Sequence, residues 1–343
     1  MKFLSLLGAL SLAMLAANTV PAQAQPQYKL TKTVTLGGAI KWDYLHFDAA
    51  TDRLYVSHGD VVDVLNGKTG AKIGELRGLP GSHGITVDPA SGLVYADSAK
   101  NNQAIAFDPK NFKPVATMPV VRDADGMAYD ARSRQIFVAG GDGKAITPIS
   151  TVTQKPAPDI ALGGSPEFLV ADDAGSLYAN INDKNEIVRI DTKTNTVAAR
   201  WPVTPCESPT GLAIDAKNRL LFSSCHSGVM IVMNADTGKI VASLPIGNGT
   251  DAAAFDVTTH QAFSSNADGT LNVIGETSTT AFTEVSIPTA KAARTMAVNP
   301  ATGRIYLITA TVISTTPPAI PGGRIHYVFA PGSVKLLIFD PVK

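Results

Sequence analysis

The sequence predicts an all-β protein, a seven-bladed β-propeller of four-stranded antiparallel blades. Short apolar runs alternate with turns rich in Gly, Asp and Asn, and a unit of four such runs recurs down the chain. An aromatic residue in the second run of each unit marks the repeat, at Tyr55, Tyr95, Phe137, Tyr178, Phe222, Phe263 and Tyr306. The spacings are 40, 42, 41, 44, 41 and 43 residues, which is the period of a propeller blade.

The clearest copy of the unit spans residues 210–249. Its four apolar runs are 212–214, 220–222, 229–233 and 240–246, with polar turns at 215–218 and 236–238. Short runs joined by Gly, Asp and Asn turns are typical of antiparallel strands. One such unit cannot bury both of its faces, whereas seven units packed around an axis can.

Residues 1–24 have the features of a signal peptide. Lys2 supplies a positive start, residues 3–17 form an apolar run, and Ala22-Gln23-Ala24 matches a small-x-small cleavage pattern. We therefore expect cleavage between Ala24 and Gln25, and a mature chain of residues 25–343 that forms one propeller domain in the periplasm or outside the cell. The alternative is a retained membrane anchor. No later apolar run approaches transmembrane length, so we expect no membrane span in the mature chain.

The charge balance argues against electrostatic binding to nucleic acid or to an anionic membrane. The chain has 29 Lys plus Arg and 29 Asp plus Glu, and it contains no basic block. A length of 343 residues exceeds that of most single domains, but the core of a repeat protein grows with each unit.

Six blades follow one another without a linker, and a seventh begins near Arg294. The expected blades are 41–78, 82–120, 124–164, 166–203, 210–247 and 250–288. The first apolar run of the expected mature chain, 28–37, resembles the fourth strand of a blade, whereas the last run, 335–340, resembles a third strand. We expect the N-terminal strand to complete the last blade, because ring closure leaves no unpaired strand edge.

The last blade carries an insertion at residues 311–332. It contains Pro317, Pro318, Pro321 and Pro331, which favour an ordered loop or a short irregular excursion over a central strand. The insertion follows the second strand, so it emerges on the rim that carries the connections between blades. Insertions on one face of a repeat array are typical of a binding face, although a tolerated loop is an equal alternative.

The two cysteines, Cys206 and Cys225, are expected to form a disulfide. An even number of cysteines in an exported chain favours pairing, and the repeat places both residues on one rim. The bond would close a loop of about 20 residues and stabilise the fold by about 3 kcal/mol. A metal or redox pair is the weaker alternative, because the chain has no C-x-x-C motif and no third cysteine.

Seven residues that open the innermost strands are predicted to form a ring at the mouth of the central channel. Each lies five residues before the turn Asp or Asn of its blade; they are Asp43, His83, Asp125, Glu167, Thr210, Asp251 and Arg294. The next position is often small, as expected where strands crowd an axis, with Gly84, Gly126, Gly211 and Ala252. Carboxylates gathered in a concave mouth raise one another's pKa or recruit a cation. The alternative is a structural ring whose side chains form hydrogen bonds only with loop amides and water.

No cofactor is predicted, but a bound divalent cation is an open alternative. His58 and His83, together with Asp43 and Asp125, are its tentative ligands, although no short ligand spacing supports them. The remaining histidines, among them His46 and His260, are interpreted as incidental.

The ends of several second strands resemble the YVTN repeat. The tetrads are Tyr55-Val56-Ser57-His58, Tyr95-Ala96-Asp97-Ser98, Tyr178-Ala179-Asn180-Ile181 and Tyr306-Leu307-Ile308-Thr309. The phrase MAVNPATGRIY is similar to the first two strands of the YncE-like periplasmic propellers of that family. The resemblance covers the mature chain and implies the propeller fold and an extracytoplasmic binding or scaffold role. It implies no catalytic set, and Phe222-Ser223-Ser224-Cys225 departs from the repeat.

We therefore expect an extracytoplasmic, non-enzymatic propeller, a monomer that binds a small ligand or a protein partner through its top face. The chain lacks G-x-S-x-G, H-E-x-x-H, P-loop and C-x-x-C-H motifs. The rival hypothesis is a metal-dependent hydrolase, lyase or isomerase that uses carboxylates and histidine at the channel mouth.

Overall fold

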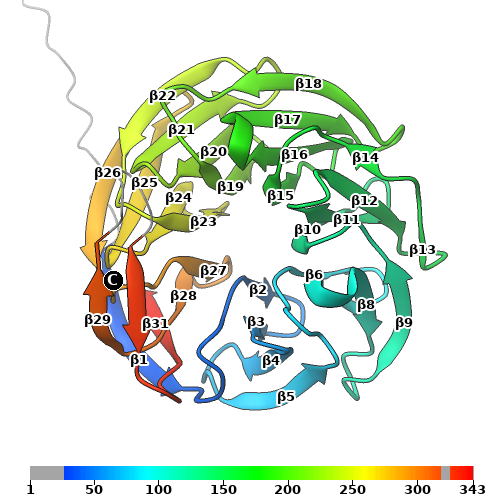
Figure 1. Cartoon of the computed structure of the whole chain (residues 1–343). Coiled ribbons are helices and arrows are strands. Elements are labelled where there is room, and N and C mark those ends of the chain that lie inside the picture. The colour runs from blue at the N-terminus through cyan, green and yellow to red at the C-terminus, as the bar shows by residue number, and fades with distance from the viewer. Residues whose placement is uncertain (1–26, 318–324, 343) are drawn as a thin grey trace, which may run out of the picture.

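Seven antiparallel sheets surround a central axis in the computed structural model, which describes residues 27–317 and 325–342 (Figure 1). The predicted seven-bladed propeller is confirmed. The innermost strand of every blade faces the centre of the ring in Figure 1; these strands are β2, β6, β10, β15, β19, β23 and β27. The expected signal peptide and its cleavage point lie outside the described residues.

The first three blades follow the expected order. Blade one consists of β2 (Leu45–Asp48), β3 (Arg53–His58), β4 (Val61–Asn66) and β5 (Lys72–Arg77). Blade two consists of β6 (Ile85–Val87), β7 (Val94–Ser98), the 3-10 helix η1 (Ala99–Asn101), β8 (Gln103–Phe107) and β9 (Pro114–Pro119). Blade three consists of β10 (Ala124–Asp130), β11 (Gln135–Gly140), β12 (Ala145–Ser150), β13 (Lys155–Pro156) and β14 (Ile160–Ala161).

The remaining blades have four strands each. Blade four consists of β15 (Pro166–Ala171), β16 (Ser176–Ile181), the 3-10 helix η2 (Asn182–Lys184), β17 (Glu186–Asp191) and β18 (Thr196–Pro202). Blade five consists of β19 (Pro209–Asp215), β20 (Leu220–Cys225), β21 (Val229–Asn234) and β22 (Ile240–Pro245). Blade six consists of β23 (Thr250–Asp256), β24 (Gln261–Asn266), β25 (Thr270–Ser278) and β26 (Ala281–Pro288). Blade seven consists of β27 (Thr295–Asn299), β28 (Arg304–Thr309), β31 (Lys335–Pro341) and β1 (Tyr28–Thr35).

The outer strand of blade three differs from the expected single strand. It is divided into β13 and β14, which both pair with β12. Pro156 and Pro158 lie in this segment. Proline cannot donate a hydrogen bond to a strand ladder, so the two prolines account for the interruption.

The N-terminal strand closes the ring, as predicted. β1 pairs antiparallel with β31, from Tyr28 opposite Pro341 to Thr35 opposite Lys335. The resulting sheet order is β1-β31-β28-β27. Tyr28 is buried and its hydroxyl donates to Gln261 Oε1 of blade six at 3.0 Å, which also ties the first strand to the neighbouring blade.

The apolar core lies between neighbouring blades. All seven repeat-marking aromatic residues are fully buried. Tyr178 of blade four, for example, packs in one cluster with Leu212 and Ile231 of blade five, and its hydroxyl donates to the Ala235 carbonyl at 3.0 Å. The large buried aromatic at each blade contact therefore supplies much of the apolar burial that holds the ring together.

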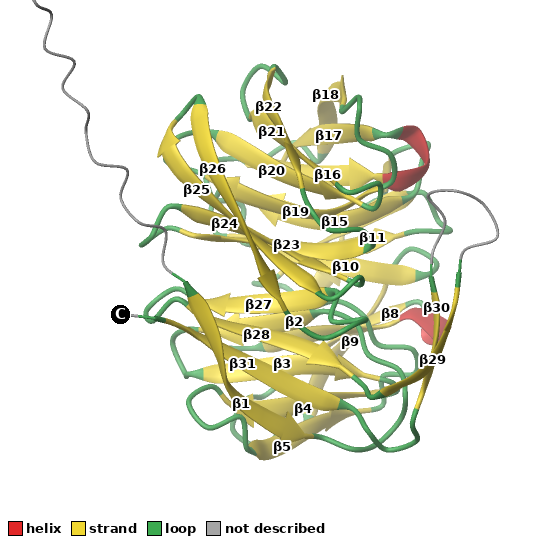
Figure 2. Ribbon diagram, turned by 90° about the vertical axis from the view of Figure 1, so that its left-hand side faces the viewer, coloured by secondary structure: helices red, strands yellow, loops and turns green. Residues whose placement is uncertain are grey.

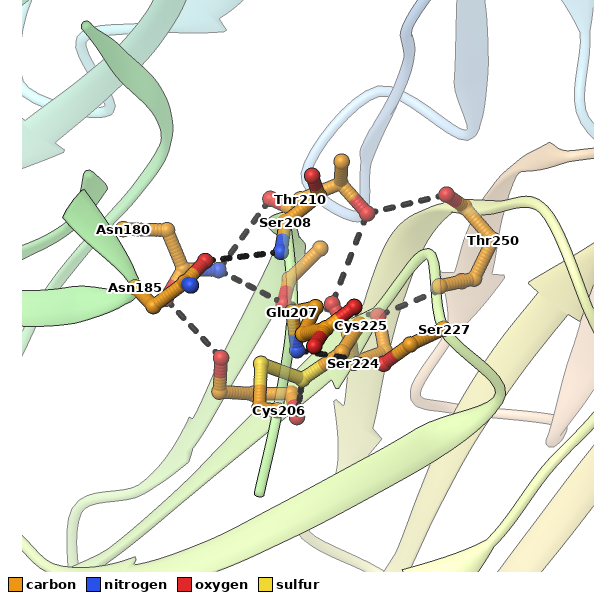
Figure 3. Close-up of a disulfide and its surroundings, with 12 residues drawn as sticks. Asn180, Asn185, Cys206, Glu207, Ser208, Thr210, Ser224, Cys225, Ser227 and Thr250 are labelled. Atoms are coloured by element: carbon orange, nitrogen blue, oxygen red, sulfur yellow. Dashed lines mark hydrogen bonds between the residues drawn. A yellow bond between two sulfur atoms is a disulfide. The ribbon is translucent and has the colours of Figure 1, made fainter. Parts of the chain in front are cut away.

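The predicted disulfide between Cys206 and Cys225 is present, with a Cα–Cα distance of 5.6 Å (Figure 3). It joins the loop before β19 to the end of β20. Around it, the Glu207 N–H donates to Ser227 Oγ at 3.1 Å, and the Ser208 N–H donates to Asn185 Oδ1 at 2.9 Å. A disulfide in this position is typical of proteins in an oxidising environment.

The insertion of blade seven forms a β-hairpin, where a loop or irregular excursion was expected. β29 (Val312–Thr316) pairs antiparallel with β30 (His326–Phe329). Pro318 and Pro321 fall outside the described residues. Figure 2 shows the hairpin on the side of the molecule that also carries the two 3-10 helices. None of the helices in the described part of the chain is long and apolar enough to cross a membrane.

Candidate functional site

The predicted ring residues lie at one end of the inner strands, which we call the upper rim. Asp43, His83 and Arg294 precede β2, β6 and β27, whereas the other four lie within the first residues of β10, β15, β19 and β23. The opposite end of the inner strands, where each turn Asp or Asn is located, is the lower rim. The upper rim also carries the disulfide and the inserted hairpin.

Three of the predicted residues, Asp43, His83 and Asp125, come together in what we call the mouth cluster. His83 Nδ1 lies 2.5 Å from Asp43 Oδ2 and 3.7 Å from Asp125 Oδ1. One ligand atom from each residue falls within 4.8 Å of the others, a spacing that can hold a metal ion. The side chains are 15–23% exposed, so the cluster faces solvent only in part.

The mouth has an excess of carboxylates. Burial raises the pKa of Asp125 well above its usual range, and the charges of Asp43 and Glu167 raise it further. Burial opposes protonation of His83, but the hydrogen bond and charge of Asp43 outweigh it, so the pKa of His83 is raised. Arg294 Nε donates to Asp251 Oδ2 at 2.9 Å. The charge of Asp251, and to a smaller extent that of Asp43, raises the pKa of this arginine.

Asp97 supports the mouth cluster from below. It is fully buried at the end of β7 and accepts backbone N–H groups from His83 at 2.7 Å and Gly84 at 2.8 Å. Burial raises the pKa of Asp97 to about 8. The repeat places Asp97 at the end of the second strand of its blade. Its role in positioning His83 depends on the fold of blade two and was not predicted.

Two of the predicted residues outside the cluster, Thr210 and His58, are engaged in contacts elsewhere. Thr210 is fully buried, and its hydroxyl donates to the Thr250 carbonyl at 2.9 Å, so it links blades five and six (Figure 3). His58, a tentative metal ligand, is engaged on both ring nitrogens, with Asp63 Oδ2 at 2.8 Å and the Ala39 carbonyl at 2.8 Å. Its imidazole therefore links β4 to the segment that precedes blade one.

Tyr44 and Phe168 form an aromatic pair beneath the mouth, which we call the plug. Their rings meet edge to face with centroids 5.2 Å apart. Tyr44 is 7% exposed, and burial raises the pKa of its phenol well above the usual range, with further contributions from Asp125 and Glu167. The equivalent residues of neighbouring blades are Gly84 and Gly126, so the two aromatic residues depart from the repeat. That departure is visible in the sequence and could have identified them.

A mostly apolar cavity of about 570 Å³ lies on the other side of this plug. Its lining comes from the inner strands of blades one to four and extends from Tyr44 and Phe168 to the turns of the lower rim. His46 lines it, and burial lowers the pKa of this histidine to about 4. Because the lining is apolar, a charged ligand is better accommodated at the mouth than in this cavity.

The inserted hairpin borders the mouth. The Tyr327 hydroxyl donates to the Ala267 carbonyl in the upper loop of blade six at 2.7 Å. Phe329 contacts Trp42, the residue before Asp43, with ring centroids 5.1 Å apart. The hairpin thus bridges blades six and one and adds aromatic side chains to the rim beside the acidic residues.

Comparison with known proteins supports the fold alone. No family model matches the chain, and no curated protein matches it. A chain of the Kuenenia stuttgartiensis hydrazine synthase structure aligns with a TM-score of 0.68 and 12% identity, over 88% of this chain and 98% of that one. A chain of a mitotic checkpoint complex aligns with a TM-score of 0.73 and 14% identity, over 97% of this chain and 99% of that one. The resemblance to YVTN-repeat proteins thus depends on the sequence motifs.

Proposed function

We propose that this chain is a non-enzymatic binding scaffold whose upper rim binds a ligand that carries a positively charged group. The observation that carries the proposal is the mouth cluster, where Asp43 and Asp125 flank His83. Carboxylates that raise one another's pKa gain free energy when a cation enters between them. The guanidinium of Arg294 donates to Asp251, so its direct ion pair is with a carboxylate outside the cluster.

The surroundings of the cluster favour an organic cation or a basic side chain. Tyr44 and Phe168 form an aromatic floor, and Trp42, Tyr327 and Phe329 lie on one side of the rim. Aromatic faces beside carboxylates attract ammonium and guanidinium groups through charge and quadrupole interactions. The ligand is accordingly a small molecule, or a protein partner that presents a basic residue.

An extracytoplasmic location is part of the same proposal. The disulfide between Cys206 and Cys225 is stable in an oxidising compartment. Together with the signal-peptide features of residues 1–24, it favours the periplasm, or secretion, as the place of action.

Thermal-shift measurements with a panel of charged small molecules test the proposal. We expect butylammonium and tetramethylammonium to raise the melting temperature, because each can lie between the carboxylates of the mouth. Acetate should have no such effect. In Asp125→Asn the shift should decrease by at least half, since one of the two flanking charges is removed.

Asp142→Asn is the matched control. Asp142 also lies on the upper rim, but its side chain is 70% exposed and its one ion pair, with Arg122, is long at 4.0 Å. Removing the charge of Asp142 should therefore leave the thermal shifts unchanged. Stabilisation by acetate rather than by the cations, or equal shifts in Asp125→Asn and the wild type, would contradict the proposal.

The mouth cluster also favours a second candidate, a metal-dependent hydrolase, lyase or isomerase. Its basis is the spacing of Asp43, His83 and Asp125, which suits one divalent cation. Elemental analysis of protein purified without chelator distinguishes the two. One metal per chain that is lost in Asp43→Asn would favour the enzyme, whereas metal-free protein that still binds organic cations would favour the scaffold.

A further inference from the structure

At the contact between blades four and five, the turn aspartate is paired with an arginine of the next blade. Arg219, at a left-handed position of the blade-five turn (φ 56°), reaches back to the preceding blade. Its Nη1 donates to Asp172 Oδ2 at 2.9 Å, and its Nη2 donates to Tyr178 Oη at 3.0 Å. Asp236 accepts from the same guanidinium at 2.7 Å. The buried Asp172 therefore faces a full positive charge.

The next contact, between blades five and six, has different residues at the same positions. His260 takes the place of Arg219, with φ 53°. Phe222, which has no hydroxyl, takes the place of Tyr178. Glu276 takes the place of Ala235. The Glu276 N–H donates to the His260 carbonyl at 3.0 Å, and the Ala235 N–H donates in the same way to the Arg219 carbonyl at 2.8 Å.

The acidic residue at this position departs from the repeat. The N–H groups that make the equivalent bond in other blades belong to small residues, at Gly67, Thr151 and Thr192. The backbone bond therefore needs no carboxylate, and the acidic side chain of Glu276 is a feature of this blade alone among the blades compared. His260 Nδ1 also approaches Asp215, at 3.8 Å from its Oδ2.

Asp215 and Glu276 meet without a donor between them. Asp215 is 2% exposed; its Oδ1 accepts the N–H groups of Lys217 at 2.9 Å and Asn218 at 3.1 Å. Glu276 Oε1 accepts from Asn218 Nδ2 at 2.9 Å. The second oxygen of each carboxyl group is buried, and among the described residues no donor reaches it. Two carboxylates in this position need a shared proton or a cation.

We propose that Asp215, His260 and Glu276 form a contact site that binds a first-row divalent cation such as Zn²⁺. Their ligand atoms lie within 4.8 Å of one another, and two carboxylate oxygens with one imidazole nitrogen suit this ion. A double positive charge balances the two carboxylates. The His260 side chain is 40% exposed and opens the site to solvent. The contact site lies on the lower rim, so it is independent of the mouth.

Calorimetric titration with Zn²⁺ tests the contact site. The starting protein is the full chain with Asp43→Asn and Asp125→Asn, which removes two ligands of the mouth cluster. We expect it to bind one Zn²⁺ per chain. Adding Glu276→Ala or His260→Arg should weaken binding at least 30-fold, because each removes a ligand. Both changes introduce a residue that blade five has at that position, so the local backbone should be preserved.

Glu186→Ala, which removes a partly exposed carboxylate paired with Arg200, is the control and should leave Zn²⁺ affinity unchanged. X-ray absorption of the Zn²⁺ complex should show one imidazole ligand. The proposal is contradicted if the starting protein binds no Zn²⁺. It is also contradicted if the variant with Glu276→Ala or His260→Arg binds Zn²⁺ as tightly as the starting protein does.

Discussion

The two ends of the central channel are built by the same inner strands but differ in chemistry. At the lower rim each turn aspartate accepts a backbone N–H of its own turn; Asp48, for instance, accepts from the Ala50 N–H at 3.0 Å and from the Thr51 hydroxyl at 2.5 Å. Asp215 is the exception, because its second oxygen also faces Glu276. At the upper rim Asp43 and Asp125 meet across His83. Carboxylates whose bonds are satisfied locally support the fold, whereas carboxylates that meet one another can bind a ligand.

The plug between the two ends makes this difference possible. Tyr44 and Phe168 separate the acidic mouth from the apolar cavity of about 570 Å³. The carboxylates of the mouth cluster are only partly exposed, so their interactions with a cation are stronger than in water. Three changes test how far the two ends depend on this separation.

The largest effect is expected for Tyr44→Ala. Truncating a buried aromatic side chain removes its packing and enlarges the adjacent cavity, which should lower the free energy of unfolding by about 3 kcal/mol. Tyr44→Phe keeps the ring and should cost less than about 1 kcal/mol, since only the hydroxyl is lost. Urea unfolding of both variants provides the measurement. A loss below about 1 kcal/mol in Tyr44→Ala would show that the plug contributes little.

A smaller effect is expected for Gly84→Ala, beside the plug. An added Cβ would lie 2.1 Å from the Asp125 carbonyl oxygen, so the inner strands of blades two and three would have to separate. Overpacking of this kind should cost about 2 kcal/mol in urea unfolding. Gly141→Ala is the control, because there the nearest atom is a side-chain oxygen of Asp123 at 3.1 Å. Equal stabilities of the two variants would contradict the tight approach of the strands.

The smallest effect concerns the pH dependence of His46 in the lower cavity. Burial lowers its pKa from 6.5 to about 4, so below pH 6.5 the unfolded chain takes up a proton that the folded chain does not. Stability should therefore fall as the pH decreases from 6.5 towards 4. His46 is half-buried, so between pH 7 and pH 5 we expect the wild type to lose about 1 kcal/mol more than His46→Gln. Urea unfolding at both pH values measures this; an equal loss would place His46 in a solvated environment.

Much of the fold could be predicted from the sequence because the repeat is local and periodic. The spacing of the aromatic residues predicts the blades, and the unmatched runs at the two ends predict closure by β1. The disulfide follows from the positions of Cys206 and Cys225 within one blade. The placement of these residues at one end of the inner strands was also predictable, because each lies five positions before the turn Asp or Asn of its blade.

What the sequence did not predict depends on contacts between blades. Thr210 occupies a ring position, yet its hydroxyl bonds to the Thr250 carbonyl of the next blade. His58 is held by Asp63, and the proline-containing insertion pairs as a hairpin. The most informative residues, among them Tyr44 and Glu276, are those at which the repeat is broken. A comparison of equivalent positions for such departures could have found both.

Calorimetric titration of butylammonium into the wild type and into the Asp43→Asn, Asp125→Asn double variant tests the central claim most directly. The proposed binding mode predicts one butylammonium per wild-type chain at the mouth. It also predicts at least tenfold weaker binding to the double variant, about 1.4 kcal/mol, because both flanking charges are lost. Equal affinity of the two proteins would contradict a cation-binding mouth and would place any binding elsewhere on the propeller.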